Sequence, residues 1–573
     1  MLKKRWIFKD EPDINTVLAL ADSLNISNVL ARLLIHRDVK GFFEAKSFFR
    51  PTLESLYDPF LMDGMNEASN RVIEAITNNE TICIYGDYDV DGTCAASLMY
   101  LFLKDLGANV FIYIPNRLTE GYGISITSID IIKAKGASLL ISVDCGITAV
   151  EEVAYSNTLG INVIICDHHK PKEILPAALA VLDPLKPGCN YPFKYLSGAG
   201  VAFKLTRAVG HKIGKKDNPL QYLDLVALAG AADIVPLLDE NRTLVMKGLE
   251  LINSNPRPGI LALIRISRME PGDLSAGQIV FTIAPRINAV GRLGDANRAV
   301  ELFTTSNHAE AAKLAKILEE ENYERRKIDE MTFSHALDMV STKIDLNTDM
   351  GIVLHDDNWH PGVIGIVASR LVEKYYRPAV MLTTIDGVAK GSARSVSGFN
   401  IYQALEKCND LLLQFGGHEA AAGVALEINK IDEFRTRFSD ILRKTLNSNS
   451  VMPEILIDSK LTFSEITPKF VRILGQFAPF GPGNLRPTFL TEQVKIVYPP
   501  RIVGLNHLVL VVKQFDSDKV FDAIGFNLSY FADDIDKDKN LIDIVYTIDK
   551  IVKDGKSYPQ LRIKDIRISE NND

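Results

Sequence analysis

The chain is poor in cysteine and lacks the cysteine spacings of zinc sites. It has six cysteines in 573 residues and no CxxC pair. Four of them lie in or beside apolar runs, namely Cys83, Cys94, Cys145 and Cys166. This pattern excludes a disulfide-rich secreted class and a thiolate zinc site, and it favours buried, reduced thiols in a cytoplasm.

Long hydrophobic runs are also missing. No apolar stretch approaches the roughly 20 residues that span a bilayer. The N-terminal MLKKRWIFKDEP begins basic but continues with acids and a proline where a signal peptide needs an apolar core. The sequence therefore predicts a cytoplasmic protein without membrane association.

Excess positive charge, internal repeats and low-complexity tracts are absent as well. The net charge of −8 gives no global sign of nucleic-acid binding. It does not exclude such binding, because phosphate contacts need only local basic patches and bound metal ions supply further positive charge.

The order of apolar patterns predicts an α/β protein with several domains. Residues 1–75 have helical, mixed-charge patterns, and residues 76–308 alternate strand-like and helix-like segments, which is typical of a parallel sheet. Residues 309–347 predict a long connecting helix, and 348–447 a second, smaller α/β domain. Residues 452–573 contain strands and turns without long helices, which predicts a small β-barrel of the OB type.

Three buried-strand patterns in the first α/β region run directly into acidic residues. They are TICIYGDYDVDG (81–92), ASLLISVDCGI (137–147) and INVIICDHHK (161–170). The carboxyl ends of parallel strands meet at one edge of a sheet, so the following side chains are expected to converge there: Asp87, Asp89, Asp91, Asp144, Asp167, His168 and His169. A small-residue helix in LVALAGAADIVPLL (225–238) would direct Asp233 to the same edge.

Such crowding of carboxylates indicates bound cations, because like charges disfavour one another when they are brought together. An EF-hand is excluded for GDYDVDG, since a strand precedes it and the twelfth position is Leu98 instead of a bidentate glutamate. A solvated turn explains one acidic motif but not three. Carboxylate and imidazole ligands suit Mn²⁺ or Mg²⁺, and two such ions can activate water for in-line attack on phosphorus.

The three acidic segments leave the histidine roles open. Adjacent residues on an extended segment point oppositely, so His168 and His169 are not expected to approach the same ion closely. One is expected to coordinate metal and the other to bind substrate or orient a ligand; a helix-capping histidine is the plainer alternative. Asp144 is the candidate to bridge two ions, because its strand is expected to lie between the other two.

These residues resemble the four motifs of the DHH phosphoesterases. GDYDVDG, VDCG, DHH and the acid after a small-residue helix carry the resemblance. GSARS (391–395) and GGHEAAAG (416–423) are similar to the glycine-rich motifs of the accompanying DHHA1 domain. WHPGVIGIVASRL, PRINAVGRLGDA and FAPFGPGN narrow the resemblance to the bacterial single-strand-specific exonucleases of that family, over nearly the whole chain.

The resemblance implies a 5′→3′ exonuclease that releases mononucleotides from single-stranded DNA with Mn²⁺ or Mg²⁺. The implied metal ligands are Asp89, Asp91, Asp144, His168 and Asp233, with Asp87 as a further one. The implied catalytic residues are Asp144, His168 and His169, the last in substrate or leaving-group contacts. The implied substrate-binding residues are Arg370, Ser392 and Arg394, which hold the 5′ phosphate, and His418, which contacts a substrate phosphate.

Residue chemistry supports the phosphate motifs, although each has a plainer interpretation. Arginine grips phosphate bidentately, and glycines before a small-residue helix, as GGHEAAAG is expected to be, let phosphate approach the helix N-terminus. GGHEAAAG also fits a close-packed helix start, and Arg370 fits an ion pair with Glu373. Arg286 and Arg292 fit either a DNA channel or interdomain ion pairs. FAPFGPGN fits a rigid turn.

Two further function classes stay open from the sequence. One is a phosphodiesterase of small substrates, such as a cyclic dinucleotide, a short RNA or polyphosphate, for which the barrel is unnecessary. The other is a non-catalytic replication scaffold, which has no need for so many acids. The expected partners are single-stranded DNA and, by resemblance, a single-strand-binding protein and a RecQ-type helicase, with the chain a monomer.

Overall fold

The computed structural model describes residues 3–117, 119–346, 348–446, 452–515, 517–535, 541–553 and 556–569. Its contacts divide the chain into two units. The first comprises Met1–Arg5, Asn116–Gly121 and Pro285–Glu454, and the second comprises Trp6–Pro115, Tyr122–Ala284 and Ile455–Asp573. The domain boundaries expected from the sequence stay predictions.

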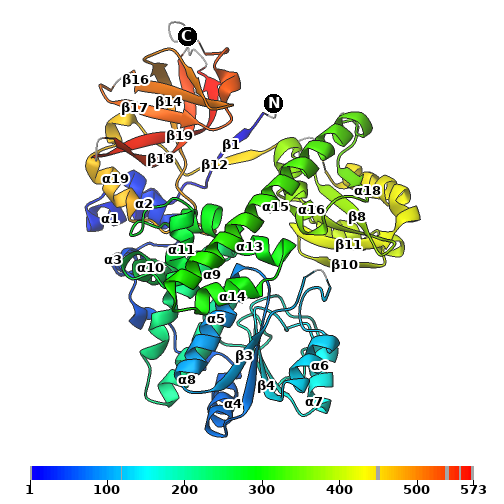
Figure 1. The fold of residues 1–573 in the computed structure, drawn as a ribbon. Coiled ribbons are helices and arrows are strands. Elements are labelled where there is room, and N and C mark those ends of the chain that lie inside the picture. Colours follow the sequence, from blue (N-terminus) through cyan, green and yellow to red (C-terminus); the bar gives the residue numbers. More distant parts are fainter. Residues whose placement is uncertain are drawn as a thin grey trace. The chain divides into compact units, whose positions relative to one another are not determined.

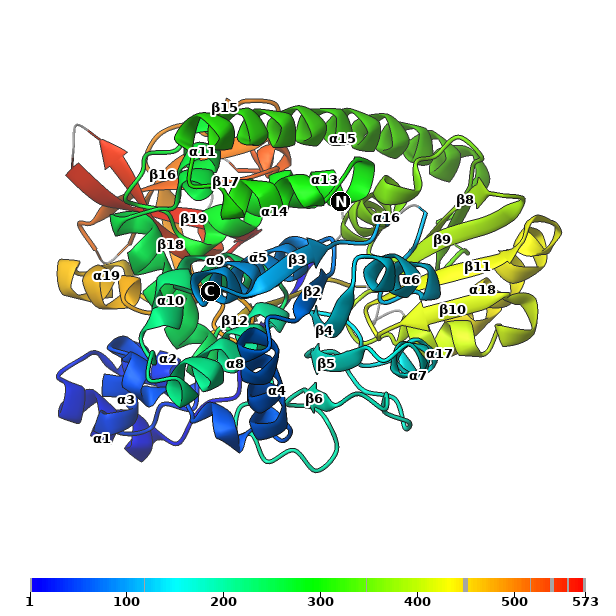
Figure 2. The same ribbon diagram turned by 60° about the horizontal axis from the view of Figure 1, so that its bottom comes forward.

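A five-stranded parallel sheet forms the centre of the second unit. Its strand order is β3-β2-β4-β5-β6 (Figure 2). The strands are β2 (Thr81–Gly86), β3 (Asn109–Tyr113), β4 (Ala137–Val143), β5 (Asn162–Cys166) and β6 (Ala180–Leu182). The inner strands are buried apolar runs, as expected for a sheet with helices on both faces. Because β4 lies between β2 and β5, the predicted central place of the Asp144 strand is confirmed.

Helices cover both faces of this sheet (Figure 1). On one face lie α4 (Met65–Thr77), α5 (Val90–Asp105) and α8 (Gly198–Lys212), and on the other α6 (Ile126–Ala134) and α7 (Val150–Thr158). A helical layer follows: α9 (Leu223–Ala232), α10 (Asp239–Ser254), α11 (Pro258–Ile266), α12 (Ala276–Gln278) and the π-helix η4 (Ile279–Ile283). The small, apolar α9 is buried all round and ends at Asp233, as the sequence predicts.

In the first unit, three helices precede a second sheet. The helices are α13 (Ala284–Leu293), which begins at the unit boundary, α14 (Asn297–Thr304) and α15 (His308–Lys343). The predicted long helix is α15 (Figure 1). The sheet has the order β10-β11-β9-β8-β7, in which only β7 and β8 are parallel. Its elements are β7 (Ile352–His355), α16 (Pro361–Tyr375), β8 (Ala379–Ile385), β9 (Val388–Arg394), α17 (Ile401–Glu406), β10 (Gln414–Gly417), β11 (Ala421–Glu427) and α18 (Ile431–Thr445).

The expectation that GGHEAAAG starts a helix is wrong. Its residues form the hairpin of β10 and β11, and β11 also pairs with β9, where Gly423 lies opposite Ser392. Gly417 has φ 142° and a Cβ there would lie 2.4 Å from the carbonyl oxygen of Ala421. The small residues of this motif allow the strands to approach closely. No helix begins at these glycines, so they cannot bind a phosphate at a helix N-terminus.

The C-terminal region is a β-barrel, as predicted. Strand β14 pairs with both β18 and β16, which closes a ring of five strands in the order β14, β18, β19, β17, β16. Its elements are β12 (Glu454–Ile457), β13 (Ser459–Lys460), α19 (Pro468–Gly475), β14 (Phe489–Ile496), β15 (Arg501–Val503), β16 (His507–Gln514), β17 (Val520–Gly525), β18 (Ile542–Lys553) and β19 (Lys556–Ile568). An OB fold has this five-stranded closed architecture.

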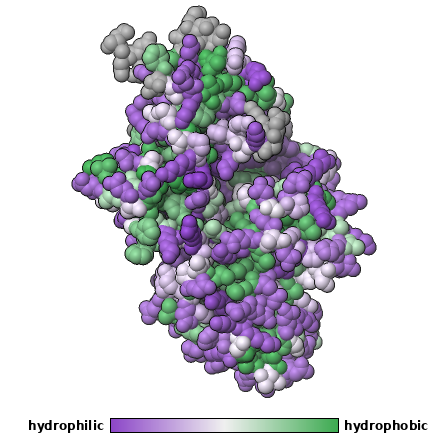
Figure 3. Space-filling view, turned by 90° about the vertical axis from the view of Figure 1, so that its left-hand side faces the viewer, coloured by the Kyte–Doolittle hydropathy of each residue, from purple (hydrophilic) through white to green (hydrophobic). Residues whose placement is uncertain are grey.

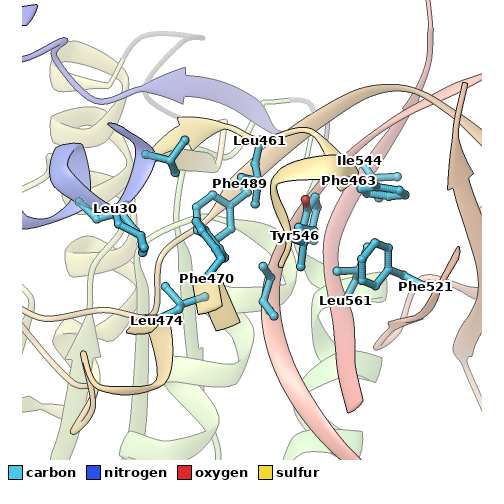
Figure 4. Close-up of a cluster of buried hydrophobic side chains, with 14 of the residues drawn as sticks. Leu30, Leu461, Phe463, Phe470, Leu474, Phe489, Phe521, Ile544, Tyr546 and Leu561 are labelled. Carbon is cyan, nitrogen blue, oxygen red and sulfur yellow. The ribbon is translucent and has the colours of Figure 1, made fainter. Parts of the chain in front are cut away.

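The N-terminal segment is mainly helical but shares its core with the barrel. It contains β1 (Arg5–Phe8), which pairs with β12, and the helices α1 (Ile14–Leu24), α2 (Asn28–Ile35) and α3 (Phe42–Phe49). Leu30 of α2 belongs to the same apolar cluster as Leu461, Phe489 and Leu474 (Figure 4). Burial of this common apolar surface joins the first helices to the last domain.

The surface mixes polar and apolar residues. On the face in Figure 3, hydrophilic residues are widespread and hydrophobic residues form smaller groups among them. Among the described residues, no single helix has the length and hydropathy to cross a bilayer. The bent pair of α1 and α2 meets those two criteria when both helices are counted together.

Candidate metal centre

The turn from β2 into α5 gathers three aspartates. Asp89 caps α5, because its Oδ1 accepts the N–H of Gly92 at 3.0 Å. A Cβ on Gly92 would lie 2.6 Å from the backbone N and O of Asp87. Only glycine permits this close fold, which brings Asp87 and Asp89 together at the edge and turns Asp91, in the first helical turn, toward α8.

The N-terminus of α8 holds Asp91. The backbone N–H groups of Gly198 and Ala199 donate to its two carboxylate oxygens at 2.6 and 2.7 Å. Ser197 caps the same helix through the N–H of Gly200. These donors and the helix dipole stabilise a carboxylate at this position. This support was not predicted from the sequence, although a serine followed by three small residues is a recognisable helix start.

Asp144 follows β4 in a left-handed conformation. Its φ is 61°, and its N–H donates to the carbonyl of Cys166 at 2.9 Å, which links the ends of β4 and β5. Aspartate tolerates this region better than most residues. The carboxylate is buried against Gly198, where a Cβ would lie 2.6 Å from the Cβ of Asp144.

The DHH residues after β5 divide their roles. Asp167 is satisfied by neighbours: Oδ2 accepts the N–H of Ile147 at 2.9 Å, and Oδ1 accepts the backbone N–H groups of His168 and His169. His169 Nδ1–H also donates to Asp167 Oδ1 at 2.8 Å. His168 Nε2 faces the acids instead, 3.1 Å from Asp144 Oδ1.

These contacts set the charge states of the pair. Burial disfavours the imidazolium form, but the hydrogen bond and charge of Asp167 raise the pKa of His169 to about 9. Burial, opposed by the charge of Asp233, lowers the pKa of His168. A neutral imidazole is the form that binds a metal.

Asp233 joins the site from a helix end, as predicted. It caps α9, its Oδ1 accepts the N–H of Ile234 at 2.8 Å, and its Oδ2 lies 3.7 Å from His168 Nε2. Asp233 Oδ2 and Asp144 Oδ1 are buried, yet neither accepts a hydrogen bond within the described part of the chain. Buried oxygens in this state call for a cation or a water molecule as their partner.

The side chains form ligand sets that share members. Three groups of ligand atoms each lie within 4.8 Å: Asp87, Asp89 and Asp144; Asp144, His168 and His169; Asp91, His168 and Asp233. Burial, and then the charge of neighbouring aspartates, raises the pKa of Asp144 and of Asp91. A divalent cation removes this repulsion, and oxygen and imidazole donors fit Mn²⁺ or Mg²⁺.

Tyr122 is a further residue at the site, and it was not predicted from the sequence. Its hydroxyl lies 3.5 Å from the carbonyl oxygen of Asp144 and 3.5 Å from His169 Nδ1. The residue as a whole is exposed, but desolvation of its hydroxyl, and then the charges of Asp167 and Asp144, raise the pKa of Tyr122, so it stays a neutral phenol. The sequence signal that could have identified Tyr122 is its place between two glycines in EGYGIS; both glycines have a positive φ in the structure.

Two predicted phosphate-binding residues lie together in the first unit. Arg394 donates to Ser392 Oγ at 2.7 Å, and a Cβ on Gly365 of α16 would lie 2.8 Å from Arg394 Nη2. His360 caps the same helix through the N–H of Gly362. Burial and the charge of Arg117 lower the pKa of both Arg394 and His360. This concentration of positive charge beside a helix N-terminus suits an anion.

The other two predicted phosphate-binding residues lie elsewhere in the first unit. Arg370 pairs with Asp329 and Glu330 of α15 at 3.2 and 3.1 Å, and its guanidinium stacks over Phe333. The predicted partner Glu373 is not among these contacts. His418 is exposed in the turn between β10 and β11. The substrate roles of Arg370 and His418 stay predictions.

The two remaining candidates, Arg286 and Arg292, both lie in the first unit. Arg286 is buried and forms an ion pair with Glu319 of the same unit, while Arg292 donates to the carbonyl of Gly362.

The chain matches three known domain families. These are the DHH family N-terminal domain over residues 81–230, the DHHA1 domain over 348–444 and the RecJ OB domain over 457–565. The single-stranded-DNA-specific exonuclease RecJ of Bacillus subtilis is 38% identical over 573 residues, 99% of this chain and 71% of that protein. RecJ of Dickeya dadantii is 34% identical, over 95% of this chain and 96% of that protein. The chain belongs to the RecJ family.

A solved RecJ structure agrees with this membership. The crystal structure of Thermus thermophilus RecJ in complex with Mn²⁺ superposes with a TM-score of 0.84 at 28% identity, over 99% of this chain and 80% of that chain. The same protein has been crystallised with Mg²⁺. The DHH resemblance and the predicted fold class, with a parallel-sheet domain, a smaller α/β domain and an OB-like barrel, are confirmed.

Proposed function

We propose that this chain is a single-stranded-DNA-specific exonuclease that works 5′→3′ and releases 5′-mononucleotides with two Mn²⁺ or Mg²⁺ ions. The observation that carries the proposal is the place of Asp144 at the carboxyl edge of the parallel sheet: it shares a ligand set with Asp87 and Asp89, and its Oδ1 lies 3.1 Å from His168 Nε2 of the set with Asp91 and Asp233. The curated relatives are named single-stranded-DNA-specific exonucleases, which supports the same substrate. A role in DNA recombination and repair stays a prediction.

The proposed ligands are Asp87, Asp89, Asp91, Asp144, His168 and Asp233, with Asp144 common to both ions. Bound ions supply water activation and charge stabilisation at phosphorus. The protein supplies geometry: Gly92 and the α8 N-terminus fix the acids, and Asp167 holds His169. His169, with its proton on Nδ1 toward Asp167, is the proposed contact to a substrate or leaving-group oxygen.

The polarity is proposed from the anion-suited cluster in the first unit. Arg394 and Ser392, with Arg117 and the N-terminus of α16, would hold the 5′ phosphate, since guanidinium groups and helix N-termini both bind phosphate. A single-strand-binding protein and a RecQ-type helicase stay predicted partners. The cytoplasmic location and the monomeric state also stay predictions. The five sequence ranges stay the proposed domains.

The test uses a single-stranded oligonucleotide labelled at either end, with Mn²⁺ or with EDTA. We expect mononucleotides from the 5′ end with Mn²⁺ and intact strand with EDTA. Asp144→Asn should abolish hydrolysis while strand binding persists, and Asp273→Asn, at an exposed aspartate of the same unit, should match the parent. Hydrolysis by Asp144→Asn at the parental rate would refute the shared-ligand assignment.

The polarity has a separate test. Arg394→Ala should reduce the preference for a 5′-phosphorylated strand over a 5′-hydroxyl strand. An unchanged preference would remove the 5′-phosphate role without touching the metal centre. Arg370→Ala in the same assay decides whether the residue contributes beyond its two ion pairs.

A further inference from the structure

The first turn of α10 contains three consecutive buried polar residues, Glu240, Asn241 and Arg242. Successive helical residues point about 100° apart, so three buried neighbours need partners in three directions. Glu240 accepts bonds from the N–H of Tyr57, the hydroxyl of Tyr191 and Lys204 Nζ. Arg242 donates to the carbonyls of residues 48, 476, 477 and 478. Both therefore join distant segments of the second unit.

Asn241 has a different pair of partners. Its side-chain N–H groups donate to the carbonyl of Tyr195 at 2.5 Å and to the carbonyl of Pro236 at 3.0 Å. Pro236 lies three residues after Asp233, and Tyr195 lies two residues before Ser197, the cap of α8. One buried amide thus ties the segment that carries Asp233 to the helix start that holds Asp91.

The segment after Asp233 is also held from its other side. The N–H of Leu237 donates to the carbonyl of Pro482 at 2.7 Å. A Cβ on Gly481 would lie 2.6 Å from the Leu237 side chain, and a Cβ on Gly483, where φ is 71°, would lie 3.0 Å from the Leu238 side chain, so a larger residue would displace these leucines. The motif FAPFGPGN therefore packs against this segment, while Asn241 holds its inner side.

The two carboxylates that Asn241 connects belong to the same ligand set. Asp91, His168 and Asp233 offer atoms within 4.8 Å of one another, whereas Asp87, Asp89 and Asp144 form a set built on the β2 turn and β4. Partners that hold metal ligands in place commonly change metal affinity by about 10–100-fold when they are removed. A change at Asn241 is therefore expected to affect one ion more than the other.

We propose that Asn241 is a positioning residue of the metal centre, which holds Asp91 and Asp233 at the distance that one divalent ion requires. This inference rests on the proposed function and adds a residue that touches neither metal nor substrate. It also gives FAPFGPGN a role beside that of a turn.

The experiment is a titration of the full chain with Mn²⁺ alone, followed by electron paramagnetic resonance of free Mn²⁺, with melting temperature measured in parallel. We expect Asn241→Ala to weaken one of two sites by about 10-fold or more and to leave the other near the parental value. Turnover should recover when Mn²⁺ saturates the weakened site. Thr243→Val, which removes a buried hydroxyl bonded only to the carbonyl of Asp239 on the same helix, is the control and should bind as the parent does.

The outcomes separate the two proposals. A parent chain that binds no Mn²⁺ refutes the proposed function itself. If the parent binds two ions and the folded Asn241→Ala variant binds them with the same two affinities, the positioning role of Asn241 is overturned while the proposed function stands. If that variant does not fold, Asn241→Leu keeps the branched shape of the side chain while it removes the amide, and it must weaken the same site. Hydrogen exchange of the parent adds a check: Mn²⁺ must slow the amides of residues 197–199 and also those of Ile234, Val235 and Leu237, and a lack of slowing in either segment overturns the inference.

Discussion

Gly198→Ala changes no charge and no ligand, yet we expect it to disable the metal centre. Gly198 is the first residue of α8, and a Cβ there would lie 2.6 Å from Asp144 Cβ, 2.7 Å from its Oδ1 and 2.9 Å from its Cα. Asp144 and α8 must separate by roughly 0.8 Å before these atoms reach ordinary contact. The N–H of Gly198 also holds Asp91, so carboxylates of two ligand sets move together.

The expected magnitude follows from the size of this displacement. Overpacking a buried position costs about 1–3 kcal/mol of stability, which a domain of this size tolerates. A misplacement of about 1 Å at a reacting centre can cost about 100-fold in rate. Gly198→Ala should therefore lower turnover on single-stranded DNA about 100-fold while the chain remains folded.

The assay compares turnover, Mn²⁺ affinity and melting temperature for three chains. The control is Gly277→Ala, because Gly277 is an exposed helical glycine where an added Cβ would meet no other atom within 4 Å. We expect the control to match or exceed the parent in stability. Parental turnover and parental Mn²⁺ affinity in Gly198→Ala would refute the close packing of α8 on Asp144.

Two further predictions concern stability. Burial alone would raise the pKa of Asp458, but the His36 ring and the Lys9 ammonium, with the N–H of Thr488, lower it to about 2. A lowered carboxyl pKa stabilises the fold above the unfolded value near 3.8, and this contribution, about 2 kcal/mol, is lost as pH falls from about 4 to about 2. Asp458→Asn should therefore lower the melting temperature at pH 7 and remove that acid dependence; equal melting curves at pH 7 would contradict the assignment. Arg242→Met should lower the free energy of unfolding by about 3 kcal/mol or more, because buried carbonyl groups lose their hydrogen-bond donor. Denaturant unfolding measures this change. A midpoint equal to that of the parent would contradict the prediction and show that water replaces the guanidinium.

The acidic residues at the carboxyl edge of the parallel sheet were predictable from the sequence because each is identified by the residues directly before it. A β-branched run identifies each strand, and the acid after it must lie at the carboxyl edge. The placement of Asp89, Asp144 and His168 therefore needed only strand polarity. The position of β4 between β2 and β5 needed the usual short connections of parallel sheets as well.

The support for these acids was not predictable in the same way. Gly198 follows Asp144 by 54 positions, carries no chemistry of its own, and matters only because a helix start meets a strand end. GGHEAAAG shows the opposite difficulty. Its small residues fit a helix start and a tight hairpin equally well, and the pairing of β11 with β9, more than twenty residues away, decides between them.

The structure also shows why counting acids overestimates a ligand set. Asp167 stands among the acids of the predicted edge, but both its oxygens are occupied by three backbone N–H groups and the His169 ring. Asp144 and Asp233 each keep one buried oxygen that accepts no hydrogen bond from the described residues. Bonded oxygens do not by themselves exclude a ligand, because both oxygens of Asp91 accept backbone N–H groups while its side chain still belongs to a ligand set. The hydrogen bonds of each oxygen nevertheless distinguish Asp167, which orients the His169 ring, from Asp144 and Asp233, whose buried oxygens call for a cation or a water molecule.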